Sequence, residues 1–194
     1  MNYYILDTAG DLNNRDYCFI DSEPYGIPKA RYAVSHGERA TGNVPVEQDE
    51  IEFRLGEDNP GLVLASLLGN VGSYLLLNKQ VISAIKELNL GDLELFQFIL
   101  LNHKGKIHSK DYCIVNPVGD YDCLNKERSI FKYSSTGKLI RIKKMVFNKQ
   151  KLERANDLFR LHDKPNRYLV SEKFKDTIEV NGFSNFLFEQ VETD

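Results

Sequence analysis

The chain has 194 residues, with 25 Lys and Arg against 28 Asp and Glu, so its formal net charge is −3. Hydrophobic residues make up 42% and charged residues 27%, the composition of an ordinary soluble globular protein. The weakly acidic balance argues against constitutive, non-specific DNA binding, and ten Tyr with eleven Phe are too many aromatic residues for a disordered chain. Three Cys cannot form a full disulfide framework and suit a reducing compartment.

Neither a signal peptide nor a membrane span is predicted. Residues 1–7 carry no basic region and no apolar run long enough for a signal peptide. The most apolar segment, residues 61–77, is interrupted by Ser, Asn and Gly, whereas a membrane helix needs about 20 mostly apolar residues. We therefore expect a cytoplasmic protein that does not enter the membrane.

Residues 1–60 are predicted to form a turn-rich β region because Gly and Pro recur throughout residues 7–60. Short strands are expected at Tyr3–Leu6, near Tyr32–Val34 and at Ile51–Leu55. Residues 61–194 are expected to form an α+β core, and the two regions together are expected to make one compact domain.

A helix followed by a strand is predicted from residue 78. Asn78 can cap the helix, whose apolar positions follow the helical period, and the next strand is expected to be largely buried. The helix face and the strand comprise Val81, Ile82, Ile85, Leu88, Leu93 and Leu95.

The same pattern recurs 93 residues later, beginning at the potential cap Ser171. Asn181 and Gly182 are expected to end this second helix. Its apolar face and the strand after it, which should pack together, comprise Phe174, Ile178, Val180, Phe186 and Phe188. The repeat is compatible with a structural duplication, and equally with two independent uses of a common pattern.

The sequence between these units is rich in strand signals. A strand is predicted at Tyr112–Asn116, and a hairpin from Ser129–Tyr133 and Lys138–Phe147 around a Ser-Ser-Thr-Gly turn. A helical turn at residues 149–155 and a strand at Leu158–Leu161 follow. The predicted fold class is α+β, with a mixed or mainly antiparallel sheet and few helices.

Motifs that would indicate catalysis are absent from the sequence. It has no phosphate-binding loop, no dinucleotide-binding glycine motif and no Gly-x-Ser-x-Gly elbow. His103, His108, Cys113 and Cys123 have the side chains of a zinc site, but their spacings of five, five and ten residues are not those of structural zinc sites. We predict no catalytic residue, no metal and no cofactor.

A cysteine and two aspartates in this region suggest other chemistry, for which each is poorly suited. Cys123 lies beside acidic residues, which would raise the thiol pKa and weaken it as a nucleophile, so an inert buried Cys is expected. Asp120 and Asp122 are too few oxygen ligands for a divalent cation, so a solvated turn is expected. An enzyme built around Cys123 or His108 is the least favoured function.

Charge is distributed unevenly along the chain. Residues 1–100 carry 7 basic and 15 acidic side chains, whereas residues 101–194 carry 18 basic and 13 acidic ones. A concentrated acidic stretch could meet a basic partner, and we predict partner binding there, at Glu47, Asp49, Glu50, Glu52, Glu57 and Asp58. The alternative is a nucleic-acid-binding or regulatory module that uses the basic stretch 138–154.

The order of short motifs from residue 112 onward resembles immunity protein family eleven, a former domain-of-unknown-function family of bacterial polymorphic-toxin systems. These motifs are Tyr112-Cys113-Ile114-Val115-Asn116, Tyr121-Asp122-Cys123-Leu124-Asn125 with Ser129, Lys144-Met145-Val146-Phe147, Asp157-Leu158-Phe159-Arg160-Leu161, Tyr168-Leu169-Val170-Ser171-Glu172 and Phe186-x-Phe188. The match covers residues 65–192 well and residues 8–60 poorly.

The chain departs from the family pattern at two places. Asn125 stands where an acidic residue is expected, four residues before Ser129, and Ser184-Asn185 replaces an expected Thr-Gly. The resemblance implies a small cytoplasmic protein that binds and neutralises a cognate toxin or effector domain. It provides no catalytic residues to carry over. We expect neither a nucleic acid nor a membrane as a partner.

Overall fold

A computed structural model describes residues 2–44, 51–56 and 58–194 of the chain. The first four-stranded sheet has the order β10–β11–β1–β12 and is antiparallel throughout. Its strands are β10 (Leu158–Leu161), β11 (Lys164–Ser171), β1 (Tyr3–Asp7) and β12 (Leu187–Gln190). The predicted strands at Tyr3–Leu6 and Leu158–Leu161 are thereby confirmed.

The second four-stranded sheet has the order β3–β6–β7–β5 and is mixed, because β3 runs parallel to β6 while the other pairs are antiparallel. Its strands are β3 (Glu52–Arg54), β6 (Leu93–Leu101), β7 (Ile107–Pro117) and β5 (Leu75–Asn78). The short strands β2 (Phe19–Ile20) and β4 (Gly69–Asn70) pair in parallel beside it. The α+β class with mixed and antiparallel sheets and few helices is confirmed.

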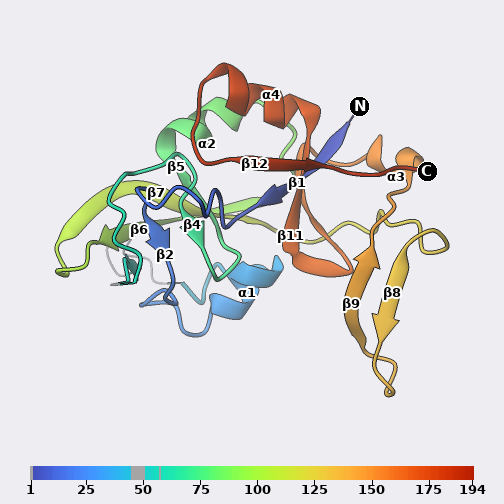
Figure 1. Ribbon diagram of the computed structural model, residues 1–194, viewed down its shortest axis with the longest axis horizontal. Helices are drawn as coiled ribbons and strands as arrows, with labels where there is room; N and C mark the ends of the chain where they lie inside the picture. The colour runs from blue at the N-terminus through green and yellow to red at the C-terminus, as the bar shows by residue number, and fades with distance from the viewer. Residues whose placement is uncertain (1, 45–50, 57) are drawn as a thin grey trace.

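The two sheets contain matching strand–helix–strand units. In one, β5 leads into α2 (Lys79–Ile85), and β6 then returns so that β5 and β6 flank β7. In the other, β11 leads into α4 (Glu172–Val180), and β12 returns so that β11 and β12 flank β1. The two helices lie side by side on the same side of the sheets (Figure 1). This shared topology favours a structural duplication over two unrelated uses of one sequence pattern.

Both unit helices begin at the predicted caps. The Asn78 side chain accepts a hydrogen bond from the N–H of Val81 at 2.9 Å, and the Ser171 hydroxyl accepts one from the N–H of Phe174 at 3.3 Å. Gly182 follows α4 with a φ of +66°, a backbone conformation that favours glycine, as expected after a helix end.

One central apolar core lies between the sheets and these two helices. It takes residues from both units, and alternate residues of β5, β7 and β11 point away from it into separate outer cores. Buried members of the central core are Leu6, Leu67, Leu75, Leu77, Val81, Ile85, Val115, Leu158, Tyr168, Val170, Phe174 and Ile178. The predicted packing of α4 is therefore confirmed at Phe174 and Ile178, whereas Phe186 and Phe188 are only partly buried.

Two predicted apolar positions lie on the surface instead. Val180 at the end of α4 is 83% exposed and Leu95 in β6 is 46% exposed. The strand β6 is buried at Glu94 and over residues 98–101, in line with the expected largely buried strand, but its start departs from the pattern. There Glu94 faces inward, and its carboxylate accepts hydrogen bonds from the backbone N–H groups of Ala40 and Thr41. A buried Glu whose carboxylate is hydrogen-bonded thus occupies a position at which an apolar side chain is expected.

The predicted strand near Tyr32–Val34 is wrong, because α1 (Arg31–His36) occupies this segment. Ala30, Ala33 and Val34 occur at helical spacing and pack into the outer core of the second sheet. The carbonyls of Val34 and Ser35 accept hydrogen bonds from the buried guanidinium of Arg160, so these carbonyls at the C-terminal end of the helix have hydrogen-bond partners. These tertiary contacts outweigh the strand preference of Tyr and Val.

The predicted hairpin and helical turn are both present. The hairpin consists of β8 (Ile130–Tyr133) and β9 (Leu139–Lys144), and it projects away from the two sheets (Figure 1). The helical turn is α3 (Lys149–Leu152), which lies near the C-terminus of the chain. Among the described residues, no helix has the length and apolar character needed to cross a membrane.

Candidate functional site

Only part of the predicted acidic binding stretch can be placed. Glu52 lies in β3, where its half-buried carboxylate accepts a hydrogen bond from Arg54 at 3.4 Å. Asp58 lines a pocket together with Arg15 and Asn185. The other four acidic residues of the prediction, Glu47, Asp49, Glu50 and Glu57, lie outside the described residues.

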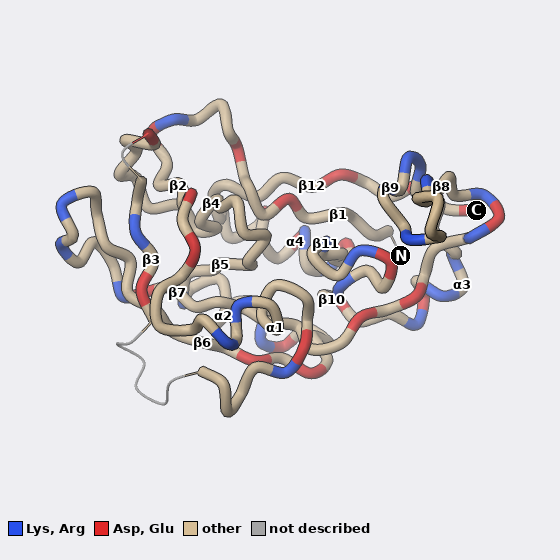
Figure 2. Tube along the Cα trace, turned by 90° about the horizontal axis from the view of Figure 1, so that it is seen from below, with Lys and Arg blue, Asp and Glu red and all other residues tan. Residues whose placement is uncertain are grey.

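Further acidic residues lie close to this part of the fold. Asp21 follows β2 and accepts a hydrogen bond from the side chain of Asn59 at 2.9 Å, and Glu23 accepts one from the hydroxyl of Tyr74 at 2.8 Å. Figure 2 shows acidic positions beside β2 and β3, interleaved with basic ones. The acidic surface therefore includes residues before the predicted stretch.

The basic stretch 138–154 divides into two structural parts. Its first half forms β9 of the projecting hairpin, and its second half forms α3 and the turn after it. Lys151 in α3 contacts Asp122 at 3.4 Å, and Lys144 at the end of β9 contacts Glu192 at 2.8 Å. Figure 2 shows basic positions around β8, β9 and α3, at the end of the molecule remote from β3.

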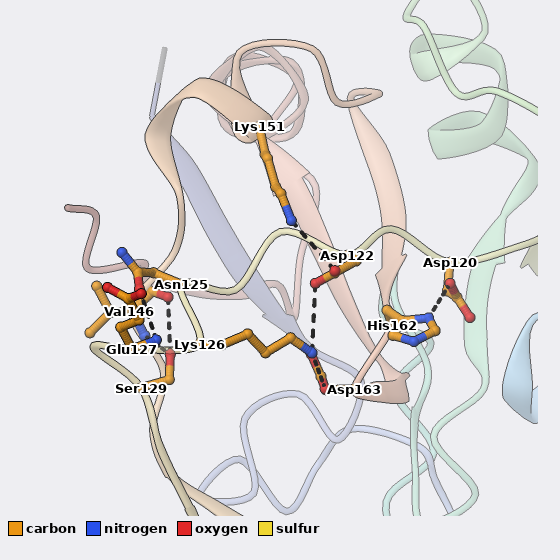
Figure 3. Close-up of polar contacts among 10 residues, drawn as sticks. All are labelled: Asp120, Asp122, Asn125, Lys126, Glu127, Ser129, Val146, Lys151, His162 and Asp163. Atoms are coloured by element: carbon orange, nitrogen blue, oxygen red, sulfur yellow. Dashed lines mark hydrogen bonds and ion pairs between the residues drawn. The ribbon is translucent and has the colours of Figure 1, made fainter.

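A network of ion pairs lies between the hairpin and the first sheet (Figure 3). The ammonium of Lys126 contacts Asp163 at 2.8 Å and Asp122 at 3.8 Å, while the ring Nδ1 of His162 lies 2.8 Å from Asp120. Hydrogen bonding to Asp163 raises the pKa of Lys126, and hydrogen bonding to Asp120 raises the pKa of His162. Asp120 and Asp122 thus have cationic or imidazole partners in a network that joins the hairpin base to the sheet.

The contacts of Asn125 show why Asn can stand where the family pattern has an acidic residue. Its side-chain oxygen accepts a hydrogen bond of 3.1 Å from the backbone N–H of Glu127 (Figure 3). It accepts another of 3.1 Å from the backbone N–H of Arg128. A carboxylate and an amide oxygen are equivalent acceptors in such a turn, so Asn can replace an acidic residue there. The amide nitrogen, which a carboxylate lacks, donates to Asp194 at 2.6 Å.

The four residues with side chains suited to zinc do not form a metal site in the structure. The Nε2 of His108 lies within hydrogen-bond distance, 2.9 Å, of the backbone carbonyl of Leu62. Cys113 is buried within β7. His103 lies in the turn between β6 and β7, where both ring nitrogens are buried and have no hydrogen-bond partner among the described residues. Within the described ranges, no three His, Cys, Asp or Glu side chains are grouped so that they could hold a metal ion.

Cys123 is fully buried in the outer core of the first sheet. Burial, followed by the negative charge of Asp122, raises the pKa of its thiol to about 12. The thiolate that nucleophilic catalysis requires is therefore not populated at neutral pH. Burial likewise raises the pKa of Cys18, to about 11.

The chain matches the model of the immunity protein family Imm11 over residues 2–193. No match was found among the curated proteins. The family match includes the turn-rich N-terminal region, which the motif resemblance covered poorly, as well as both strand–helix–strand units. Because the match extends over nearly the whole chain, this protein belongs to the Imm11 immunity protein family.

Proposed function

We propose that this protein neutralises a cognate bacterial toxin in the cytoplasm by forming a stoichiometric complex with it, without catalysis. The observation that carries the proposal is the family match over residues 2–193, because a toxin-neutralising role is what the family suggests. The complex would act by covering the toxin's active site or by holding the toxin in an inactive shape.

The side chains best suited to catalysis have other roles here, which supports binding as the mode of action. Cys123 is buried with a raised pKa, His108 hydrogen-bonds to a backbone carbonyl, and His162 pairs with Asp120. In none of these contacts does a Cys or Ser lie within hydrogen-bond reach of the imidazole, as nucleophilic catalysis would require.

A growth experiment tests this function. Toxin domains encoded in the genomic neighbourhood of the protein would be expressed in a bacterial host, with and without the protein. We expect one of these domains to arrest growth and co-expression of the protein to restore it. Failure of the protein to restore growth against every toxic neighbouring domain would contradict the proposal.

The acidic stretch is proposed to contribute to this binding. Toxins that act on nucleic acids or nucleotides need positively charged clefts, and complementary charge speeds association and confers specificity. The six acidic residues lie in a segment that the sequence predicts to be turn-rich, and binding residues are common in turns and loops.

Association kinetics test the role of this stretch. Replacing Asp49, Glu50, Glu57 and Asp58 by Asn or Gln should mainly slow association with the toxin, and the wild-type rate should fall as salt rises. A matched variant that neutralises four acidic residues elsewhere, Glu87, Glu127, Glu153 and Asp176, controls for net charge. Equal association rates for the two variants in low salt would exclude the stretch from the interface.

A further inference from the structure

The β8–β9 hairpin extends from the protein with no buried residue of its own. Every residue from 130 to 144 is exposed or only partly exposed. An isolated two-stranded hairpin is marginally stable in water, so this one depends on its attachment. At its base, Phe131 and Ile142 pack against the outer core of the first sheet, and the hydroxyl of Ser129 bonds both the N–H and the carbonyl of Val146.

The hairpin carries several cationic side chains. Lys132 and Arg141 are direct neighbours across the two strands, an arrangement of like charges that destabilises a sheet. The sequence from 128 to 152 contains no Asp or Glu. Within the described part of the chain, Lys132, Lys138, Arg141 and Lys143 form no ion pair with a carboxylate, whereas Lys144 pairs with Glu192.

The hairpin also exposes large apolar side chains. Ile130 is 52%, Tyr133 55% and Ile140 59% exposed. Tyr133 contacts Phe131, with ring centroids 6.1 Å apart. Exposed Tyr and Ile surrounded by Lys and Arg resemble the centre and rim of a protein–protein interface, where Tyr and Arg often dominate the binding energy.

These features favour a protein over a nucleic acid as the occupant. Aliphatic side chains such as Ile130 and Ile140 cannot stack on bases, and a chain with a net charge of −3 lacks the broad positive field of a nucleic-acid-binding protein. A partner surface that carries carboxylates around an apolar centre would bury the exposed side chains and relieve the repulsion between Lys132 and Arg141.

We propose that the β8–β9 hairpin is a docking arm that binds an acidic, partly apolar surface of the toxin. The proposal rests on the toxin-binding function above. It places the contact at the end of the molecule remote from β3, the strand that holds Glu52, so that the hairpin and Glu52 would meet different parts of the toxin.

Two hairpin variants test the arm. In the first, Tyr133 and Ile140 are both changed to Ser, and in the second four cations are changed to Gln, at Lys132, Lys138, Arg141 and Lys143. A control variant removes four exposed lysines elsewhere by the same change, at Lys29, Lys104, Lys106 and Lys173. Because none of the substituted side chains is buried, all three variants should unfold at the wild-type urea concentration.

Binding would be measured against the toxin domain that the wild-type protein neutralises. We expect the apolar variant to bind at least about tenfold more weakly. The charge variant should associate about tenfold more slowly at low salt, and the lysine control should match the wild type. Wild-type binding by both hairpin variants would overturn the docking arm and leave the toxin-binding function intact. No binding of any neighbouring toxin by the wild-type protein would overturn both.

Two further measurements distinguish the toxin from a nucleic acid or a second copy of the protein as the partner that binds the hairpin. A labelled 20-nucleotide polyuridine should bind the wild-type protein no better than the charge variant does. Binding of this RNA that is lost in the charge variant, with unchanged toxin affinity, would assign the hairpin to nucleic acid and overturn the proposal. A dimer of the free protein that dissociates in the apolar variant, again with unchanged toxin affinity, would assign it to self-association and overturn the proposal as well.

Discussion

The guanidinium of Arg160 donates a hydrogen bond of 3.1 Å to the side-chain oxygen of Asn116, and the amide of Asn116 donates one of 3.0 Å to the carboxylate of Glu94. Arg160 lies in the first sheet, and Asn116 and Glu94 lie in the second. This fully buried chain of polar groups therefore links the two sheets, and Glu94 continues it to the backbone of Ala40 and Thr41.

Replacing Arg160 should destabilise the protein strongly. Its guanidinium also donates to four backbone carbonyls and lies 4.3 Å from the ring centre of Tyr168. Arg160→Leu should lower the free energy of unfolding by about 3–5 kcal/mol, because each buried carbonyl left without a partner costs about 1–3 kcal/mol and part of the cost is relieved by relaxation. Urea denaturation measures this, with the exposed Arg128→Leu as control. Equal stability of the two variants would show that the buried network is unimportant.

Glu94 should make stability depend on acid pH. Burial raises the pKa of Glu94, but hydrogen bonds from the Thr41 hydroxyl, the backbone N–H groups of Ala40 and Thr41 and the Asn116 amide outweigh it, so the pKa is lowered overall. A pKa lower in the folded than in the unfolded chain stabilises the protein above the unfolded value, and this stabilisation is lost as the pH falls through the folded value.

The variant Glu94→Gln isolates this contribution. It should be less stable than the wild type at pH 7, and it should lose less stability than the wild type between about pH 5 and about pH 3. Urea denaturation across this range provides the measurement. The exposed Glu87→Gln serves as control and should follow the wild type. Parallel pH profiles for Glu94→Gln and the wild type would contradict the assignment.

The two helix caps should differ in their contribution to stability. Asn78→Ala removes one capping acceptor and should lower the free energy of unfolding by about 1 kcal/mol. Ser171→Ala should cost about 2 kcal/mol, since its hydroxyl also donates to the buried carboxylate of Asp157 at 2.5 Å, which would lose a partner. A larger loss for Asn78→Ala than for Ser171→Ala in urea denaturation would show that the Asp157 contact adds nothing.

The three cysteines should be unreactive in the folded protein. All are buried, and burial raises each thiol pKa, to about 11 for Cys18 and about 12 for Cys123. Ellman's reagent should therefore label the native protein slowly at pH 8 and label three thiols at once in denaturant. Rapid labelling of one native thiol, abolished by Cys123→Ser, would reopen the possibility of a catalytic cysteine.

Local signals made several elements predictable. The caps Asn78 and Ser171, the Ser-Ser-Thr-Gly turn of the hairpin and the apolar strand Leu158–Leu161 are each determined within a few residues, and all are present as predicted. The helix α1 was missed because its stabilising partner, Arg160, lies 125 residues from Ser35, and no local pattern reveals that contact.

The burial of polar side chains could likewise not be predicted from the sequence. Glu94 faces the interior and Leu95 the surface, the reverse of the expected pattern, because the partners of Glu94 come from a distant loop. The predicted acidic stretch stays a prediction. The basic stretch could be recognised by composition, but only the fold shows that its first half forms one strand of a projecting hairpin without buried residues.

Titration of toxin activity with the purified protein tests the central claim, stoichiometric neutralisation, most directly. The toxin domain would be held well above the dissociation constant while the protein is added in steps. We expect activity to fall in a straight line and reach zero at one equivalent, with a 1:1 complex in analytical ultracentrifugation. Complete inhibition by far less than one equivalent would indicate catalytic turnover and contradict the claim, as would inhibition without a complex.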